Sequence, residues 1–471
     1  MLLAVRLLGG EYRGLTLEVG SLEVLRLDCF AVYESKKKTM MEALKLIKSG
    51  DCIISALGAA GPSVLLGSVH TIADMGISGV DITDCLPLVP YDFVTKPNPG
   101  VIQNSGWFYS ASQRAGVKSG AMHISFVPQH LHTAGVRRMY AIHQDKRRLV
   151  LFASCSPMDE HGYLSLGLSA TYERLVVDDG AVVIAEVNAK MPRTFGDTTI
   201  HISEIDAFVE TDNSLAEIPQ VPFTEHDSKI ADFVAEMITD GSTIQLGIGG
   251  IPNALAVGLK DKKNLGIHTE MLTDNMVDLV ECGAVDNSQK SLYRHKTIGT
   301  FAMGTKKLYN FINNNPSVML KNGSWVNDPA VIGQNYKMQS INTTLEIDLF
   351  GQCASEAIGP VQFSGSGGQA DTAIGAQRTA GGHSFICLYS TAQVKNKEGN
   401  KEVISKIAPM LKHGSVVTLS RNDVDFVVTE FGIVNLRGRS IKERAERLIS
   451  IAHPDFRDEL RFHVKKHPEI F

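Results

Sequence analysis

Short apolar runs, each followed by a glycine-rich or polar turn, recur along the chain and predict strands. Three of them are AVVIAEV at residues 181–187, TIQLGIGG at 243–250 and SVVTLS at 415–420. Continuous apolar runs of this length are typical of strands buried in a sheet. Segments with a helical spacing of apolar residues alternate with them, and this alternation predicts an α/β protein.

Two helices are predicted with their ends. MMEALKLIKSG, residues 40–50, has a helical pattern that should end at Gly50, because glycine is the usual residue just past a helix C-terminus. SIKERAERLISIA, residues 440–452, begins at Ser440 with Glu443 three positions later. That spacing predicts a capping box with Ser440 as the N-cap.

Two segments of the chain resemble each other. Residues 46–69 and 237–259 both read as helix end, tight turn, strand, glycine loop, proline and helix. Asp51 stands seven positions before Gly58, and Asp240 stands seven positions before Gly247. The repeat predicts two related open α/β domains with mainly parallel sheets. Residues 214–227 carry two prolines and little periodicity, so we predict one domain over 33–220 and a second over 221–471.

The composition of the chain argues against several classes of binding partner. The 471 residues carry a formal net charge of −5, so no basic surface for nucleic acid or an anionic membrane is expected. No apolar run reaches the roughly 18 residues of a membrane span, and we expect a soluble protein. The seven cysteines are scattered and never form C-x-x-C, which favours a reducing compartment over a disulfide framework or a zinc site.

The first residues are treated separately. MLLAVRLLGG is a short apolar run for a secretory signal, and Glu11 and Glu18 are acidic for an organelle transit peptide. We interpret residues 1–32 as an N-terminal extension of uncertain status. The expected location is cytoplasmic, with a mitochondrion or related organelle as the alternative if this segment is a targeting signal.

Two glycine-rich loops are candidate ligand sites. GIGGIPNAL, residues 247–255, follows a predicted strand and opens a helix, so its backbone N–H groups could bind an anion. It is neither G-x-G-x-x-G nor a P-loop, because Pro252 holds the sixth position. SGSGGQADTAIGA, residues 364–376, also leads into a helical pattern. Structural turns without a ligand are the alternative for both loops.

Glu270, in LGIHTEM at residues 265–271, is the candidate nucleophile. A carboxylate before a helix is commonly only a partner of the helix dipole. If this segment and GIGGIPNAL are successive crossings of one parallel sheet, however, their ends meet at its carboxyl edge. A partly desolvated carboxylate beside backbone amides could then form a covalent intermediate. His161 and His201 lack the spacing of a metal site, and no G-x-S-x-G motif is present.

Taken together, the chain resembles the acetyl-CoA hydrolase/transferase family, and within it the butyrate and 4-hydroxybutyrate CoA-transferases. The resemblance runs from about residue 33 to 460, and its matching stretches are SPMDEHGYLSLG (156–167), AEVNAKMPRTFGDTTIHISEIDA (185–207), QLGIGGIPNAL (245–255), LGIHTEM (265–271), INTTLEIDLFGQ (341–352), GSGGQAD (365–371) and the long stretch 420–460.

The resemblance implies a site in the cleft between the two domains. It implies that Glu270 forms a glutamyl-CoA thioester and that one loop contacts coenzyme A through Gly247, Ile248, Gly249, Gly250 and Ile251. The second loop would complete the CoA site through Gly367 and Gly368. Acyl-CoA and a short-chain carboxylate would be substrates, with no metal and no tightly bound cofactor, and the protein would be a homodimer.

Other interpretations stay open at this point. Acetyl-CoA would donate CoA to butyrate or 4-hydroxybutyrate, but acetyl-CoA hydrolysis or acetate:succinate exchange could use the same site. A nucleotide-dependent dehydrogenase and a non-catalytic CoA-binding protein are the rivals from other classes. Residues 351–354 read GQCA where many relatives read GQVN, and this departure predicts a different wall for the acid pocket.

Overall fold

The computed structural model describes residues 28–121, 123–395 and 398–471. Positions 1–27 of the predicted extension 1–32 therefore lie outside the described residues. Helix α1 (Cys29–Lys36) follows and lies against the first half of the chain, where Tyr33 packs on Phe208 with ring centroids 4.3 Å apart.

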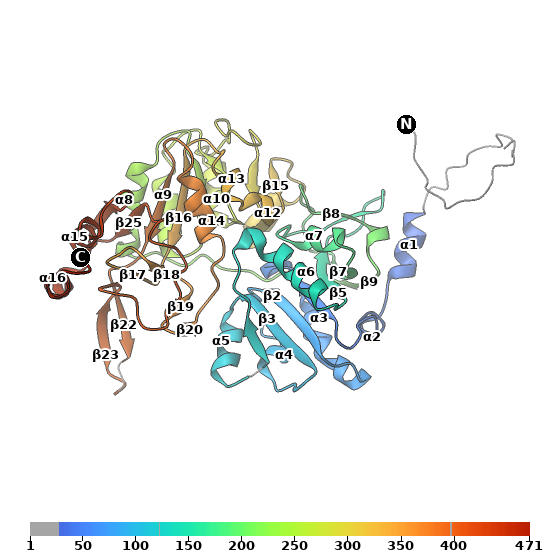
Figure 1. The fold of residues 1–471 in the computed structure, drawn as a ribbon. Helices are drawn as coiled ribbons and strands as arrows, with labels where there is room; N and C mark the ends of the chain where they lie inside the picture. The colour runs from blue at the N-terminus through green and yellow to red at the C-terminus, as the bar shows by residue number, and fades with distance from the viewer. Residues whose placement is uncertain (1–27, 122, 396–397) are drawn as a thin grey trace, which may run out of the picture.

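A seven-stranded sheet forms the core of the first half (Figure 1). Its strand order is β4-β3-β2-β1-β5-β7-β9, and every neighbouring pair is parallel. The strands are β1 (Cys52–Ser55), β2 (Val80–Cys85), β3 (Ile102–Phe108), β4 (Ile124–Phe126), β5 (Leu149–Cys155), β7 (Val182–Asn188) and β9 (Ala207–Thr211). All residues of β1, β2 and β5 are buried, as expected for central strands of a parallel sheet with both faces covered.

A six-stranded sheet forms the core of the second half, in the order β11-β10-β16-β21-β25-β26. It is parallel except for the last pair, where β26 runs antiparallel to β25. The strands are β10 (Thr243–Gln245), β11 (Gly266–Ile267), β16 (Met338–Thr343), β21 (His383–Cys387), β25 (Phe426–Thr429) and β26 (Gly432–Asn435).

The two sheets share one topology, which confirms the two related α/β halves. The order β2-β1-β5-β7-β9 in the first matches β11-β10-β16-β21-β25 in the second, with β1 and β10 in the same place. These two strands are the ones inside the repeated segments. Each is followed by a glycine loop, a proline and a helix: α3 (Ser63–Ser68) after β1, and α9 (Gly250–Gly258) after β10.

Helices cover both sheets. In the first half they are α2 (Met40–Leu44), α4 (Asp92–Thr95), α5 (Ala111–Lys118), α6 (Ala134–Gln144) and α7 (Glu173–Asp178), besides α1 and α3. In the second half they are α8 (Glu225–Met237), α10 (Asp274–Glu281), α11 (Lys306–Ile312), α12 (Gly323–Val326), α13 (Pro329–Ile332), α14 (Gln369–Ala376), α15 (Ile441–Ser450) and α16 (Pro454–Lys466), besides α9. No helix in these described ranges is long and apolar enough to cross a membrane.

Short strands outside the two large sheets form small sheets of their own. They are β6 (Tyr163–Ser165) with β8 (Thr199–His201), β12 (Met271–Leu272) with β14 (Phe301–Ala302), β13 (Thr297–Gly299) with β15 (Val318–Leu320), β17 (Glu346–Asp348) with β18 (Cys353–Ala354) and β24 (Ile407–Ala408), β19 (Ala357–Ile358) with β20 (Val361–Gln362), and β22 (Thr391–Lys395) with β23 (Lys401–Ser405).

Some of the predicted helices and strands are confirmed, and others are not. β7 and β10 confirm two of the strands, and the capping box of Ser440 and Glu443 opens α15 as predicted. The strand predicted at 415–420 is wrong: only Leu419 makes an isolated bridge, to Cys353. Val416 and Val417 are each 43% exposed, so only the end of this run, Thr418 and Leu419, is buried. The helix predicted over 40–50 is shorter, because α2 ends at Leu44 and turns lead to Gly50 at φ +83°.

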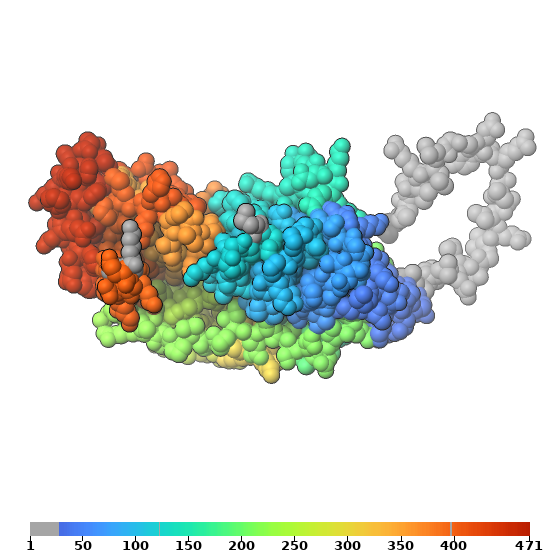
Figure 2. Space-filling model, turned by 90° about the horizontal axis from the view of Figure 1, so that it is seen from below, coloured from blue at the N-terminus to red at the C-terminus, as the bar shows by residue number. Residues whose placement is uncertain are grey.

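The two halves pack on each other over a continuous apolar core. One cluster of buried side chains includes residues of both sheets, among them Leu151 and Ile244. Residues 212–224, which contain the predicted domain boundary at 220/221, have no helix or strand. Figure 2 shows the first half, blue to cyan, beside the orange and red end of the chain, with green segments from the middle along one side.

Candidate active site

The carboxyl ends of strands from both sheets face one cavity of about 250 Å³. From the first half, Leu57, Cys85 and Trp107 line it at the ends of β1, β2 and β3. From the second half, Gly247, Glu270 and Asn342 line it at the ends of β10, β11 and β16. Ligands of open α/β sheets bind at the carboxyl ends of the strands. Two such edges therefore converge here.

Glu270 lies between β11 and β12, where the backbone changes from one short strand pairing to the next. Its carbonyl oxygen accepts hydrogen bonds from the N–H groups of Thr300 (2.9 Å) and Phe301 (3.2 Å). The preceding residues are fixed as well, since the Thr269 N–H donates to the Ile298 carbonyl at 3.0 Å. The backbone that carries this carboxylate is thus held on both sides.

The Glu270 carboxylate is packed between an amide side chain and the second glycine loop. Nδ2 of Asn327 donates to Oε2 at 2.9 Å, and the backbone N–H of Gly368 also donates to the carboxylate. Burial raises the pKa of Glu270 to about 7, and nearby Asp371 adds to the rise, while the two hydrogen bonds oppose it. A carboxylate poised near neutrality in a cleft is typical of a functional site.

Gly368 has no room for a side chain. A Cβ there would lie 2.1 Å from Oε2 of Glu270 and 2.1 Å from Nδ2 of Asn327. The neighbouring Gly367 has φ +51°, a conformation that L side chains rarely adopt. The two glycines therefore let the start of α14 touch the carboxylate, and the helix dipole favours its ionised form.

The loop after β10 uses its glycines for different purposes. Gly249 has φ +117° and is the N-cap residue of α9. Gly250 packs against α8, because a Cβ would lie 2.5 Å from Oδ2 of Asp227. A Cβ on Gly247, in contrast, would meet nothing within 4 Å, and Gly247 lines the cavity with Ile248. The loop thus turns sharply, packs tightly on one side and leaves its backbone open on the other.

A second cavity of about 240 Å³ adjoins the first on the side of α9. It is lined by Gly249, Gly250 and Ile251, and it shares Ile248 and Thr343 with the cavity around Glu270. Lys406 is the cationic side chain among its described lining residues. Burial lowers the pKa of Lys406, while Glu430 and Glu346 oppose this change. A cation beside a glycine loop at a helix N-terminus is suited to a phosphate group.

The second glycine loop is tied to the first half of the chain. The Ser366 hydroxyl donates to the Gln129 carbonyl at 2.7 Å, and the Leu131 N–H donates to the Gly367 carbonyl at 3.2 Å. His132 then pairs with Asp371 in the first turn of α14, with Nδ1 2.7 Å from Oδ1. That hydrogen bond raises the pKa of His132. The loop that touches Glu270 is thus positioned from across the cleft.

A buried lysine lies behind the Glu270 segment. Nζ of Lys290 donates to the carbonyls of Ile267 and Lys296, each at 2.7 Å, and burial lowers its pKa to about 7. Nε2 of His268 lies 2.8 Å from the Val326 carbonyl and therefore carries the proton. Burial lowers the pKa of His268 to about 3. Both side chains are directed to backbone groups and support the nucleophile segment from the core side.

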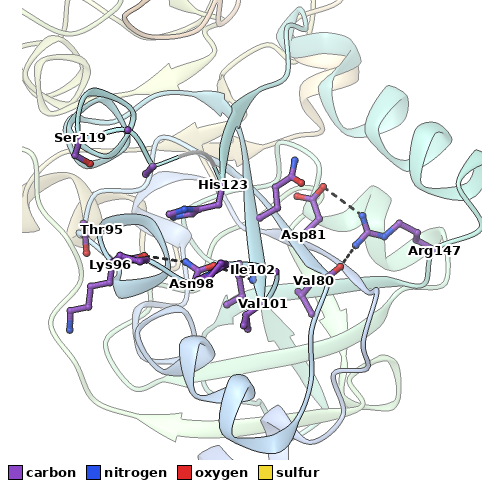
Figure 3. Close-up of a pocket in the computed structure, with 17 residues that line it drawn as sticks. Val80, Asp81, Thr95, Lys96, Asn98, Val101, Ile102, Ser119, His123 and Arg147 are labelled. Atoms are coloured by element: carbon purple, nitrogen blue, oxygen red, sulfur yellow. Dashed lines mark hydrogen bonds and ion pairs between the residues drawn. The ribbon is translucent and has the colours of Figure 1, made fainter.

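Another cavity, of about 590 Å³, lies at the amino ends of β2 and β3, away from Glu270. Figure 3 shows Arg147 directed toward Asp81 at this cavity. The Arg147 guanidinium also donates to the carbonyls of Gly50 and Gly79 at 2.7 and 2.6 Å. Arg147 and Asp81 of this cavity therefore pair with each other. None of the residues predicted for the site lines it.

The structure brings the predicted site residues together at two adjoining cavities. Glu270, Gly247, Ile248, Gly367 and Gly368 line the first, and the remainder of the GIGGI segment lines the second. The expected change in the acid-pocket wall at 351–354 is wrong. Cys353 and Ala354 are buried, Cys353 belongs to an apolar cluster, and the cavity wall begins only at Ser355.

Sequence reasoning missed the groups that complete the site. Asn327, His132 and Lys406 stand in no recognisable motif, and each reaches the site only through the fold. The apolar wall from the first half was missed for the same reason. Within the described ranges, no group of three or more His, Cys, Asp or Glu side chains could hold a metal ion.

Comparisons with known proteins find similar families, sequences and structures. The acetyl-CoA hydrolase/transferase N-terminal domain matches residues 24–222, and the C-terminal domain of the same family matches 304–464. The chain is 42% identical to a succinyl-CoA:cyclohexane-1-carboxylate CoA transferase of Geobacter metallireducens, over 91% of this chain and 94% of that protein. It is 38% identical to a 4-hydroxybutyrate coenzyme A transferase of Clostridium kluyveri, over 92% and 98%. The crystal structure of RipA from Yersinia pestis is similar with a TM-score of 0.86 and 37% identity, covering 94% of this chain and all of that one (100%).

Proposed function

Because the chain belongs to the acetyl-CoA hydrolase/transferase family and is a CoA-transferase, we propose that it moves coenzyme A from an acyl-CoA to a short-chain carboxylate through a glutamyl-CoA thioester on Glu270. The observation that carries this proposal is the contact of the Glu270 carboxylate with Asn327 and Gly368 inside the cleft.

The reaction would proceed in two covalent steps. An oxygen of the Glu270 carboxylate attacks the thioester carbonyl of the acyl-CoA, the C–S bond breaks, and CoA leaves as a thiolate. The thiolate then attacks Cδ of Glu270 in the mixed anhydride, which expels the first acid as a carboxylate. An incoming carboxylate reverses both steps, so the kinetics are ping-pong. No net proton is transferred, because the attacking and leaving groups are all anions.

Each tetrahedral intermediate places negative charge on a carbonyl oxygen beside the two glycine loops. The Gly368 N–H already donates to Glu270, and the backbone around Gly247 borders the same cavity. Preorganised amides of this kind stabilise an oxyanion, and the loss of one donor typically lowers the rate about 100- to 1,000-fold. The amide of Asn327 adds a side-chain donor at the same carboxylate.

Coenzyme A would enter over the second half of the chain. The cavity lined by Gly249, Gly250 and Lys406 suits the phosphates, and it opens through shared residues into the cavity of Glu270. Polar side chains along that route, among them Asn342 and Gln369, match the amides of the pantetheine arm. Nε2 of Gln369 donates to the Thr343 carbonyl at 2.9 Å, which fixes this side chain at the cavity wall.

The relatives named above are not all named for one acid, so family membership supports CoA transfer but not one particular acceptor. Acetyl-CoA as donor with butyrate or 4-hydroxybutyrate as acceptor is the starting proposal. Hydrolysis would use the same nucleophile and differ only in the access of water to the thioester. The homodimer expected from the resemblance stays a prediction, which sedimentation would test.

An exchange assay tests the proposed function. With acetyl-CoA and butyrate, the wild-type chain should form butyryl-CoA with ping-pong kinetics, and Glu270→Ala should abolish the exchange. The exposed Glu160 beside His161 offers a matched control, because Glu160→Ala removes a glutamate that lies outside both cavities. Release of free CoA at the same rate with and without the acceptor, and no butyryl-CoA, would identify a hydrolase instead. Full exchange by Glu270→Ala would refute the proposal.

A further inference from the structure

The cavity around Glu270 has one apolar wall, contributed by the first half of the chain. Its side chains come from the ends of β1, β2 and β3 and from the segment before α6 and its start: Leu57, Cys85, Leu86, Trp107, Phe108, Leu131 and Ala134. The cysteine belongs to this apolar surface, because burial raises the pKa of its thiol well above the usual value. Met271, Phe301 and Met303 extend the apolar surface beside Glu270.

The single polar side chain of that wall is already satisfied. When the Gln129 amide is oriented so that its oxygen faces the indole of Trp107, it accepts from Nε1 at 3.2 Å, and its nitrogen donates to the Ala134 carbonyl at 2.7 Å. A ligand group that lies against this wall therefore finds packing surface and no free side-chain partner. The facing wall from the second half, in contrast, carries Gln245, Asn342 and Gln369.

We propose that the acid bound at this site is a monocarboxylate with an uncharged apolar tail, which lies against the wall from Leu57 to Ala134 while pantetheine occupies the polar wall. This inference rests on the proposed function and names its acceptor class. It favours butyrate and bulkier branched or cyclic acids over dicarboxylates and over acids with a terminal hydroxyl. It therefore departs from 4-hydroxybutyrate, one of the two acids that the resemblance implies.

Charge is the first argument against a dicarboxylate. Glu270 is the single charged side chain among the described residues that line the cavity. A second carboxylate would be buried without a cation, and an unpaired buried charge is strongly unfavourable. A terminal hydroxyl would lose water without gaining a side-chain partner on this wall, which is also unfavourable but less so.

Arg114 is a candidate cation outside this cavity, and the donors of its Nη1 are committed. It lines the adjoining cavity that opens beside Leu86 and Phe108. Nη1 donates to the carbonyls of Tyr109 and Phe363 at 3.1 and 2.9 Å, and the guanidinium carbon lies 4.4 Å from the centre of the Phe363 ring. These contacts hold the guanidinium in the adjoining cavity, and Arg114 does not line the cavity around Glu270.

Leu86 lies at the junction of the two cavities and has an unusual backbone. Its φ is +52°, which is uncommon for a bulky residue and is typically found where function requires it. Its N–H donates to the Phe108 carbonyl at 3.0 Å, which fixes this conformation. A bulky apolar side chain thus lines both cavities, and a charged tail that reached from Glu270 toward Arg114 would lie against it.

The acceptor profile of the wild-type chain is the primary test. With acetyl-CoA as donor, kcat/KM is measured for butyrate, 3-methylbutyrate, cyclopentanecarboxylate, 4-hydroxybutyrate and succinate by mass spectrometry of the product acyl-CoA. Each buried methylene should raise kcat/KM by roughly fourfold. Succinate should fall roughly 100-fold or more below butyrate, and 4-hydroxybutyrate about tenfold below it. Equal or faster use of succinate than of butyrate would overturn the inference.

A matched pair of variants tests the wall itself. Leu86→Arg places a cation at the junction and should raise kcat/KM for succinate about tenfold or more while lowering that for butyrate. Val89→Arg makes the same change in the same loop at a side chain that lines neither cavity, and it should leave the profile unchanged. A wild-type succinate activity that disappears in Arg114→Gln would show that Arg114 binds a second carboxylate, against the inference.

Formation of the covalent adduct separates this inference from the proposed function. Each protein is incubated with acetyl-CoA alone and the mass of the intact chain is recorded. An adduct in wild type together with a preference for succinate would contradict the acceptor class and leave the mechanism standing. No adduct, and no exchange with any acid, would contradict both.

Discussion

Nδ2 of Asn327 lies 2.9 Å from Oε2 of Glu270, and Asn327 is itself 1% exposed. This hydrogen bond favours the ionised carboxylate, whereas burial disfavours it. The structure thus keeps the nucleophile desolvated, and therefore reactive, without forcing it to stay protonated. Single substitutions should therefore be able to raise or to lower the pKa of Glu270.

Asn327→Ala should weaken catalysis through the protonation state of Glu270. The loss of a hydrogen bond to a charged group costs about 1.5 to 3 kcal/mol, which corresponds to a fall in kcat of roughly 10- to 100-fold. The pKa of Glu270 should rise, so the remaining activity should need higher pH. The pH dependence of kcat/KM measures both effects. A lower kcat with an unchanged pH profile would mean that Asn327 acts on the intermediate alone.

Gly368→Ala should remove activity while the fold is kept. The added Cβ would lie 2.1 Å from the nucleophilic carboxylate oxygen, so either Glu270 or the start of α14 must move. We expect a fall in kcat of roughly 100-fold or more, since a donor at the reacting centre is displaced. Gly258→Ala, in α9, is the control, because its Cβ meets only the Ala235 Cβ at 3.5 Å. Wild-type activity in Gly368→Ala would place the reacting group elsewhere.

The rate should rise with pH through about 7. Glu270 attacks as a carboxylate, and burial raises its pKa to about 7 in the free enzyme, so kcat/KM should increase as this group loses its proton. Asp371 contributes to the raised pKa. Asp371→Asn should therefore move the ascending limb to lower pH. An unmoved limb in Asp371→Asn, or a limb that descends through this range in wild type, would contradict the assignment.

The free energy of unfolding should also depend on the protonation of Glu270. It should fall as the pH rises, whereas the rate should increase. The pKa of Glu270 is raised in the folded state from 4.5 to about 7, so its protonated form stabilises the fold below pH 4.5, and this contribution is lost as the pH rises through 7. Glu270→Gln should therefore raise the free energy of unfolding at pH 8 by about 3 kcal/mol, seen as a higher Tm, and have a smaller effect at pH 5. A larger gain at pH 5 than at pH 8 would contradict the direction of the pKa shift.

The sequence predicts the frame of this site because the frame is local. The repeat around Asp51 and Asp240 shows two α/β halves, since strand, loop and helix follow one another within about 20 residues. The glycines at 247–250 and 367–368 indicate backbone approach for the same reason. The false strand at 415–420 marks the limit of this reasoning, because an apolar run does not reveal whether its side chains will be buried.

The sequence does not predict the groups that come from other segments. Asn327 reaches Glu270 across 57 positions, and His132 reaches Asp371 across 239. Neither contact has a local signal. The apolar wall is missed because it is assembled from four separated segments whose side chains look like ordinary core residues. Only the packing of the two halves shows that they face a carboxylate and not each other.

The central claim is that Glu270 itself becomes the thioester of coenzyme A. The direct measurement is mass spectrometry of peptides from protein incubated with acetyl-CoA, after borohydride reduction, which converts a glutamyl thioester to an alcohol. The account predicts reduction at Glu270 and at no other glutamate, and none in Glu270→Gln. Exchange of CoA between acids by a protein whose Glu270 stays unmodified under these conditions would contradict it.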